Sequence, residues 1–128
     1  MTYKSEQQVQ QNMSKDLVTL RASDSLDLAY AKMVRHEIRH LPVLNEENQL
    51  VGLLSDRDLQ RALKSTVSGT DSFKFESCEF DPTSKVFDYM SSPIQSVEKE
   101  MSLKIAAKKM IEDKISALVV TDKGSVVG

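Results

Sequence analysis

The chain has 128 residues, of which 40% are hydrophobic and 28% charged, a composition ordinary for a globular domain that needs no metal or disulfide for stability. Its 17 basic and 19 acidic side chains give a formal net charge of −2, which disfavours binding to nucleic acid. Because Cys78 is the single cysteine, an intrachain disulfide is excluded. The sequence has no apolar stretch long enough for a signal peptide or a membrane span, so the predicted location is the cytoplasm.

The first half of the chain is predicted to form a small unit of strands and helices. After a polar tail at residues 1–8, apolar residues recur first in a short run, then at helical spacing behind Ser23 and Asp24, and then in two short runs around a polar turn. The two runs and the turn predict a hairpin. The expected order is strand, helix, strand, strand and helix, over residues 17–20, 26–34, 41–44, 50–54 and 56–64.

Residues 64–85 predict a linker because serine, threonine, glycine and aspartate are frequent there. Three aromatic residues, Phe73, Phe75 and Phe80, alternate with polar residues within it. Disordered linkers rarely carry so many aromatic residues, so we expect part of this segment to lie against the folded module.

The second half repeats the first at a shift of 77 positions. The matched positions are mostly apolar or small, and they include Val9 with Val86, Met13 with Met90, Ala29 with Ala106, Met33 with Met110 and Val43 with Val120. Two copies are too few for a solenoid, so we expect two repeats related by a pseudo-twofold axis. The predicted organisation is repeat 1 at residues 9–63 and repeat 2 at residues 86–128.

Repeat 2 is predicted to lack the last elements of repeat 1. Its predicted strand at 94–97, helix at 103–111 and hairpin around residues 122–125 match repeat 1, but the sequence given stops at Gly128. The counterpart Gly52 is followed in repeat 1 by the rest of a strand and a helix. The sequence therefore leads us to expect that the natural protein continues beyond this residue.

Two segments of repeat 1 resemble the signature of CBS domains, the cystathionine-β-synthase type. One is Ile38-Arg39-His40-Leu41-Pro42-Val43-Leu44, and the other runs from Leu50-Val51-Gly52 to Ser55-Asp56-Arg57-Asp58-Leu59. Met13-Ser14 and Met90-Ser91 open the two repeats in the same way. Repeat 2 departs from the pattern because it has Val119 in place of Pro42 and lacks the Ser-x-x-Asp ending.

The resemblance implies an α/β (α+β) fold of two repeats, each a small mixed sheet with two helices. It also implies a regulatory module that binds an adenosine-containing ligand, namely AMP, ADP, ATP or S-adenosylmethionine, forms a homodimer, and controls an unidentified partner or attached protein. No cofactor is required by such a module. No nucleophile elbow, P-loop or dinucleotide-binding turn is present, so we expect no enzymatic activity and no catalytic residue.

The expected ligand site lies where repeat 1 passes from its last strand to its last helix. Ser55 and Asp58, three residues apart at a helix start, predict a hydroxyl, a carboxylate and several free backbone N–H groups in one place. The carboxylate suits a ribose diol, and Arg57 suits a phosphate. The predicted ligand-binding residues are Thr19, Ile38, Arg39, His40, Val43, Ser55, Arg57 and Asp58, with Ile38 and Val43 covering the faces of the base.

Three alternatives stand beside this interpretation. The carboxylates of Asp56 and Asp58 also suit simple capping of a helix N-terminus. The module could also be a structural dimerisation or docking module whose pocket is empty. In that case its function would depend on the apolar helix faces that carry Met33 and Met110. His36 and His40 have zinc-like spacing, but Pro42 ends the helix before the second histidine and no third ligand completes a set, so no metal site is predicted.

Overall fold

The computed structural model describes residues 7–66, 80–92 and 94–128, which form two compact units. The first unit comprises residues 18–94, and the second combines residues 1–17 with residues 95–128. The N-terminal segment of repeat 1 therefore packs with repeat 2, while the N-terminal segment of repeat 2 packs with repeat 1. The repeats predicted from the sequence and the compact units in space are divided at different places in the chain. Cys78, Phe73 and Phe75 lie outside the described residues.

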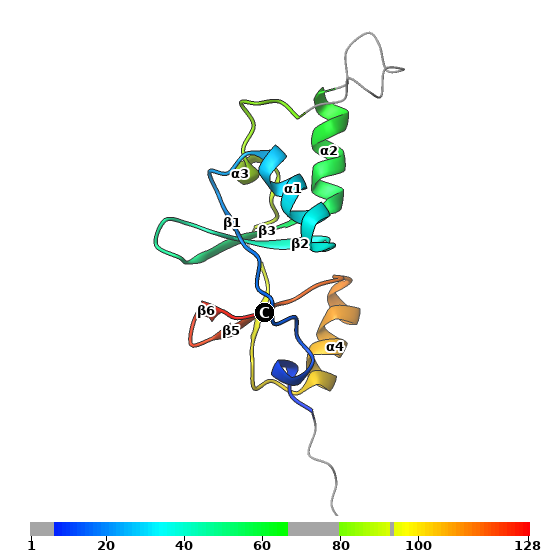
Figure 1. Cartoon of the computed structure of the whole chain (residues 1–128). Coiled ribbons are helices and arrows are strands. Elements are labelled where there is room, and N and C mark those ends of the chain that lie inside the picture. Colours follow the sequence, from blue (N-terminus) through cyan, green and yellow to red (C-terminus); the bar gives the residue numbers. More distant parts are fainter. Residues whose placement is uncertain (1–6, 67–79, 93) are drawn as a thin grey trace, which may run out of the picture. The chain divides into compact units, whose positions relative to one another are not determined.

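The first unit is a three-stranded mixed sheet with helices on one face (Figure 1). The strands β1 (Leu20–Arg21) and β2 (His40–Leu44) are parallel, and β3 (Leu50–Ser55) is antiparallel to β2. Helix α1 (Leu26–His36) makes the crossover from β1 to β2, and α2 (Asp56–Thr66) follows β3 directly. The predicted order of elements is confirmed, although β1 is only two residues long and begins where the predicted strand ends.

The core of this unit lies between the sheet and the helices. Alternate residues of β2 and β3 face the helices, so Leu41, Val43 and Leu54 are 0% exposed. Helix α1 contributes residues at spacings of three and four, because one face of the helix meets the sheet. The buried apolar residues of this core are Leu20, Leu26, Ala29, Met33, Leu41, Val43, Leu54, Leu59, Ala62, Phe80 and Val86.

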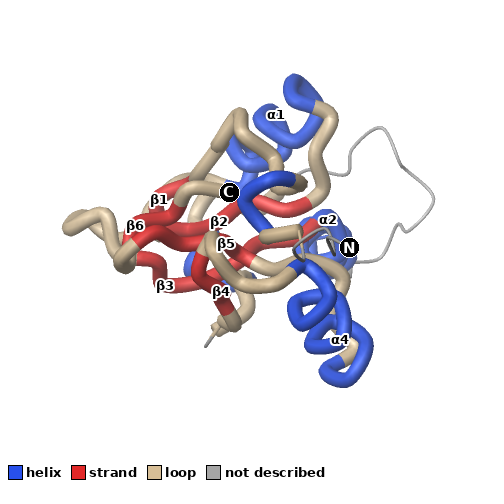
Figure 2. The backbone as a smooth tube through the Cα atoms, turned by 90° about the horizontal axis from the view of Figure 1, so that it is seen from below, coloured by secondary structure: helices blue, strands red, loops and turns tan. Residues whose placement is uncertain are grey.

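The second unit has the same sheet topology as the first, and Figure 2 labels its strands and its helix. Strand β4 (Ser96–Glu98) is parallel to β5 (Val119–Asp122), β6 (Ser125–Val126) is antiparallel to β5, and α4 (Leu103–Asp113) makes the crossover. Both crossover helices begin after a serine and end at a residue with a positive φ, 53° at Glu37 and 56° at Lys114. The similar ends place equivalent helix faces against equivalent sheet faces, as expected for a duplication.

Each repeat also begins with a short helix that the sequence reasoning did not predict. These are η1 (Val9–Gln11) in the second unit and α3 (Val86–Tyr89) in the first. Val9 and Val86 are buried, and each is followed four residues later by a methionine. The apolar spacing of four residues was the signal for these turns, but each segment was too short to show a helical period.

Candidate functional site

The passage from β3 into α2 places Ser55 and Asp58 side by side. Ser55 ends the strand, and its Oγ accepts a hydrogen bond from the backbone N–H of Asp58 at 3.2 Å. In return, the backbone N–H of Ser55 donates to Asp58 Oδ2 at 2.8 Å. This reciprocal pair is a capping box, which stabilises the first turn of a helix. The spacing of three residues therefore has a structural role in this protein.

The backbone N–H groups at the start of α2 are paired, which corrects the expectation that several would be free. The N–H of Asp56 donates to the carbonyl oxygen of Arg39 at 2.9 Å, and that of Arg57 donates to Asp56 Oδ1 at 2.9 Å. The third N–H, that of Asp58, donates to Ser55 Oγ. The reason is that Arg39, the residue directly before β2, brings its carbonyl group to this helix start, while the side chains of Ser55 and Asp56 supply the other acceptors.

Asp58 is also paired with a residue that the sequence analysis did not single out. Its side chain is 8% exposed, and Oδ1 lies 2.5 Å from Nη2 of Arg61, one turn further along α2. The same Nη2 donates to the carbonyl oxygen of Tyr89 at 3.2 Å, at the end of α3. Arg61 thus connects the Asp58 carboxylate to the short helix that opens repeat 2. The spacing of Asp58 and Arg61 was visible in the sequence, because residues three apart share a helix face.

Five of the eight predicted site residues converge at this end of the sheet. His40, the first residue of β2, lies opposite Ser55, the last residue of β3. Arg39 precedes His40 and holds the start of α2 through its carbonyl oxygen, while Arg57 is exposed on the first turn of the helix. These two residues, with His40, Ser55 and Asp58, combine a hydroxyl, a carboxylate, an imidazole and two guanidinium groups. Such a set can bind the diol and the phosphate of a nucleotide.

The other three predicted residues have different positions. Thr19 directly precedes β1, and its carbonyl oxygen accepts a hydrogen bond from Lys32 Nζ at 2.7 Å. Val43 is 0% exposed in the core, so its side chain does not cover a base from an open pocket, as the sequence led us to expect. Alternation along β2 decides this, because Val43 shares the helix-facing side of the strand with Leu41. Ile38 lies between α1 and β2, next to an apolar cavity on the helix side.

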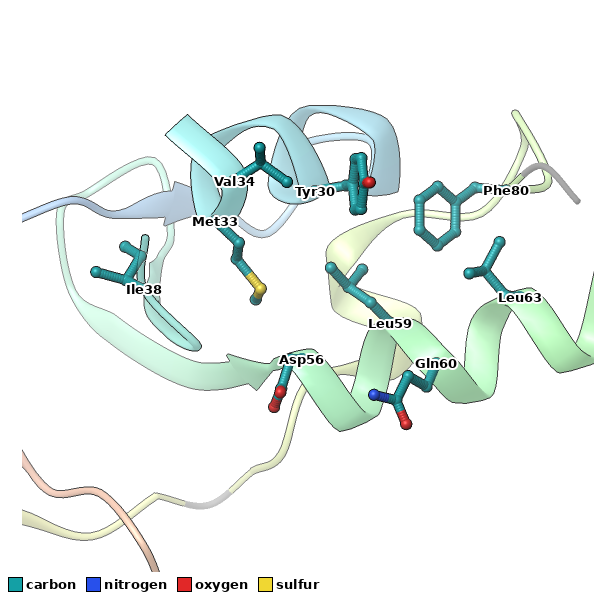
Figure 3. A pocket seen from close by; sticks show the side chains of 9 residues that line it. All are labelled: Tyr30, Met33, Val34, Ile38, Asp56, Leu59, Gln60, Leu63 and Phe80. Carbon is teal, nitrogen blue, oxygen red and sulfur yellow. The ribbon is translucent and has the colours of Figure 1, made fainter. Parts of the chain in front are cut away.

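That cavity has a volume of about 280 Å³ and lies between α1 and α2 (Figure 3). Met33 and Leu59 point into it from the two helices, and Phe80 closes one end beside Leu63. The rings of Phe80 and Tyr30 have centroids 6.1 Å apart, a distance typical of paired aromatic side chains. The linker therefore returns to the helices at Phe80. Asp56 and Gln60 are the polar residues of the lining, so the cavity does not have the polar groups expected for a whole nucleotide.

The second unit contains a larger cavity, of about 410 Å³, against α4 and β5. Leu103, Ala106 and Met110 line it, and they are the counterparts of Leu26, Ala29 and Met33. In the first unit these counterparts pack in one core with Leu59 and Ala62 of α2. The described residues of the second unit include no helix equivalent to α2.

The two histidines do not lie on one element. His36 is the last residue of α1 and His40 is the first residue of β2, as the sequence analysis predicted. Within residues 7–66, 80–92 and 94–128, no three histidine, cysteine, aspartate or glutamate side chains are grouped as metal ligands. In the same ranges, none of the helices combines the length and the hydropathy needed to cross a bilayer.

Comparison with known proteins identifies relatives for nearly the whole chain. Residues 7–65 and 86–128 match the CBS domain family. The CBS domain-containing protein YhcV of Bacillus subtilis is 28% identical over 120 residues, which cover 94% of this chain and 76% of YhcV. The chain spans 38% of the length of the uncharacterized protein MJ1225 of Methanocaldococcus jannaschii. It spans 19% and 21% of the lengths of two homoserine O-acetyltransferases.

Two solved structures with the same fold contain adenosine compounds. The crystal structure of CBSX2 in complex with AMP has a TM-score of 0.74 and 27% identity, and the alignment covers 94% of this chain and 87% of CBSX2. The CBS domain pair of protein MJ0100, in complex with 5′-methylthioadenosine and S-adenosyl-L-methionine, has a TM-score of 0.78 and 23% identity. That alignment covers 96% of this chain and 87% of the MJ0100 chain, and at this identity it shows the shared fold.

Proposed function

Because the chain belongs to the CBS domain family, we propose that it is a regulatory module that binds an adenosine-containing ligand in the first unit and controls a partner or attached protein. The candidate ligands are AMP, ADP, ATP and S-adenosylmethionine. The observation that carries the proposal is the convergence of Ser55, Asp58 and His40 at one end of the sheet, with Arg57 exposed beside them. The AMP complex of CBSX2 and the S-adenosyl-L-methionine complex of MJ0100 support the class of ligand.

In this proposal the ligand replaces hydrogen bonds that the protein makes to itself. Asp58 Oδ1 and Oδ2 accept from Arg61 and from the Ser55 N–H, and the two vicinal hydroxyls of a ribose offer two donors for the same oxygens. Binding therefore includes the opening of a capping box and of an ion pair. Since only the difference between new and old bonds appears as affinity, we expect moderate affinity and a ligand-linked change at Arg61.

A matched pair of carboxylates tests this assignment. Asp58 and Asp88 both accept the backbone N–H three residues earlier at 2.8 Å, Asp58 from Ser55 and Asp88 from Lys85. Asp58→Asn and Asp88→Asn thus alter the same capping interaction, but only Asp58 belongs to the proposed site. We expect Asp58→Asn to weaken the binding of AMP or S-adenosylmethionine about 10- to 100-fold in a calorimetric titration, because hydrogen bonds to a charged group are lost. Asp88→Asn should bind as the parent protein does.

The ribose itself provides the second arm of the experiment. 2′-Deoxy-AMP lacks one of the two hydroxyls, so Asp58→Asn should weaken its binding less than it weakens the binding of AMP if that hydroxyl is bound by Asp58. Equal binding of AMP by Asp58→Asn and the parent protein would contradict the role of Asp58. Absence of binding by every adenosine compound would reject ligand sensing.

The alternative function is a structural dimerisation or docking module without a bound nucleotide. The paired N–H groups at the start of α2 favour it, because they form a complete helix cap without any ligand. Met33 is only 7% exposed, so the surface to test is the neighbouring Val34, which is 59% exposed. If Val34→Asp abolishes regulation of the partner while Asp58→Asn leaves it intact, the docking function is the correct one.

A further inference from the structure

Both carboxylate oxygens of Asp58 accept hydrogen bonds from the protein itself. Oδ2 accepts the backbone N–H of Ser55 at 2.8 Å, and Oδ1 lies 2.5 Å from Nη2 of Arg61. The side chain of Asp58 is 8% exposed, whereas that of Arg61 is 61% exposed. The carboxylate is thus held within the fold, while the guanidinium group that covers it lies at the surface.

A second capping interaction in the same unit forms without such a cation. Asp88 Oδ2 accepts the backbone N–H of Lys85 at 2.8 Å, the same distance as in the cap at Asp58. Three residues after Asp88 the chain has Ser91, where Asp58 has Arg61. A helix start of this kind therefore forms without an arginine, and the ion pair is an addition that the cap does not require.

The ion pair occupies an oxygen that a bound ribose would use. In the proposed function, the two vicinal hydroxyls of a ribose donate to Oδ1 and Oδ2 of Asp58. A charged guanidinium donor binds a carboxylate more strongly than a neutral hydroxyl does. We propose that Arg61 is an intramolecular competitor of the ligand, which covers Oδ1 of Asp58 and is displaced when a ribose binds. The inference rests on the proposed function, since it assigns the regulation of the same site.

The same guanidinium group also holds the end of α3. Nη2 of Arg61 donates to the carbonyl oxygen of Tyr89 at 3.2 Å, in the last residue of that helix. Just beyond it, Ser91 exchanges two backbone hydrogen bonds with Leu53 of β3, at 2.9 and 3.1 Å. Displacement of Arg61 from Asp58 removes the contact that fixes its position beside Tyr89. Ligand binding therefore loosens the end of α3, and by linkage a loosened α3 favours the ligand.

Adenosine is the probe for the competition, because it has the ribose but no phosphate that an arginine could bind. In a calorimetric titration at low salt, Arg61→Met should bind adenosine about three- to fivefold more tightly than the parent protein does, since an ion pair with an exposed partner is of limited strength. Arg35→Met removes the same charge from the exposed surface of α1, and it should bind adenosine as the parent protein does.

A conservative variant and a salt series separate competition from a change of shape. Arg61→Lys keeps a cation within reach of Asp58, so its affinity for adenosine should be close to that of the parent protein. Added salt screens the ion pair between Arg61 and Asp58. The affinity of the parent protein for adenosine should therefore rise with salt concentration, while that of Arg61→Met should stay constant.

Hydrogen exchange of the Ser91 amide tests the connection to α3. This N–H donates to the carbonyl oxygen of Leu53 at 2.9 Å. Saturating adenosine should speed its exchange about three- to fivefold in the parent protein, because the local opening of α3 becomes easier. In Arg61→Met the link is already absent, and adenosine should leave the exchange of this amide unchanged.

Three results would overturn the proposal. They are an adenosine affinity that Arg61→Met leaves unchanged or lowers, a parent affinity that falls as salt is added, and an exchange rate of Ser91 that adenosine does not alter in the parent protein. In all three cases adenosine still binds, so ligand sensing itself stands. Absence of binding of both adenosine and AMP by the parent protein would instead reject the proposed function, and this inference with it.

Discussion

The side chain of Met90 lies across Gly52 at the centre of β3. A Cβ atom on Gly52 would lie 2.9 Å from Met90 Cγ and closer still to the sulfur atom, nearer than Cβ atoms approach other atoms in real proteins. Met13 has the same relationship to Gly128, where a Cβ atom would lie 2.6 Å from its sulfur. Each methionine opens one repeat and covers the glycine of the other. The methionine therefore occupies the room that the missing side chain of Gly52 leaves.

Gly52→Ala should therefore lower the free energy of unfolding of the protein by about 1 kcal/mol, as an overpacked site requires its neighbour to move. The cost stays moderate because a methionine side chain is flexible. Met90→Ala should remove the conflict, so the double variant should lose less stability than the sum of the two single variants. Chemical denaturation of the four proteins measures this coupling. Additive effects would show that the two residues do not compete for the same space.

Ser55→Ala should cost about 1 kcal/mol of stability, because the N–H of Asp58 loses its acceptor at the start of α2. Ser25→Ala is the matched control, since Ser25 Oγ accepts from the N–H of Leu28 at the same distance of 3.2 Å. Thermal unfolding should show similar losses for both variants. Only Ser55→Ala should also weaken AMP binding, and equal AMP affinities would place the Ser55 hydroxyl outside the ligand site.

Arg61→Met should loosen the attachment of α3 while keeping the aliphatic stem of the side chain. The substitution removes the hydrogen bonds to Asp58 and to the carbonyl oxygen of Tyr89. Because the Arg61 side chain is 61% exposed, we expect a global loss of no more than about 1 kcal/mol.

The local effect of Arg61→Met should be larger than the global one. Hydrogen exchange of the Leu53 amide reports it, since this N–H donates to the carbonyl oxygen of Ser91 at 3.1 Å, just beyond α3. Arg57→Met, on the exposed first turn of the same helix, should leave this exchange unchanged. Equal protection of Leu53 in both variants would argue against a link from Asp58 to α3.

Phe80→Ala should destabilise the protein by about 3 kcal/mol, because an aromatic side chain that is 8% exposed leaves a cavity between α1 and α2. Phe87→Ala removes the same atoms from a residue that is 64% exposed, and it should change stability by no more than about 0.5 kcal/mol. Urea denaturation of the two variants compares them directly. Similar losses for both would show that Phe80 does not anchor the linker to the helices.

Much of the first unit could be predicted from local patterns. Helical spacing from Leu26 to Val34 and the two apolar runs around the Asn45 turn gave α1, β2 and β3 within one or two residues, since period and turn chemistry are local properties. The Ser55 and Asp58 spacing correctly located a helix start. The state of that helix start could not be predicted, because the carbonyl group that pairs with the N–H of Asp56 belongs to Arg39, which is distant in the sequence and directly precedes β2.

By itself, the sequence determined three features, namely the duplication, the family, and the alternation of strands and helices in each repeat. All three depend on residue types at fixed spacings along the chain. Only the tertiary structure decided that the short opening helices pack with the opposite repeats, that Met90 fills the space at Gly52, and that Asp58 is bound by Arg61. Those features depend on which distant segments share a core, and burial between segments leaves no periodic signal along the chain.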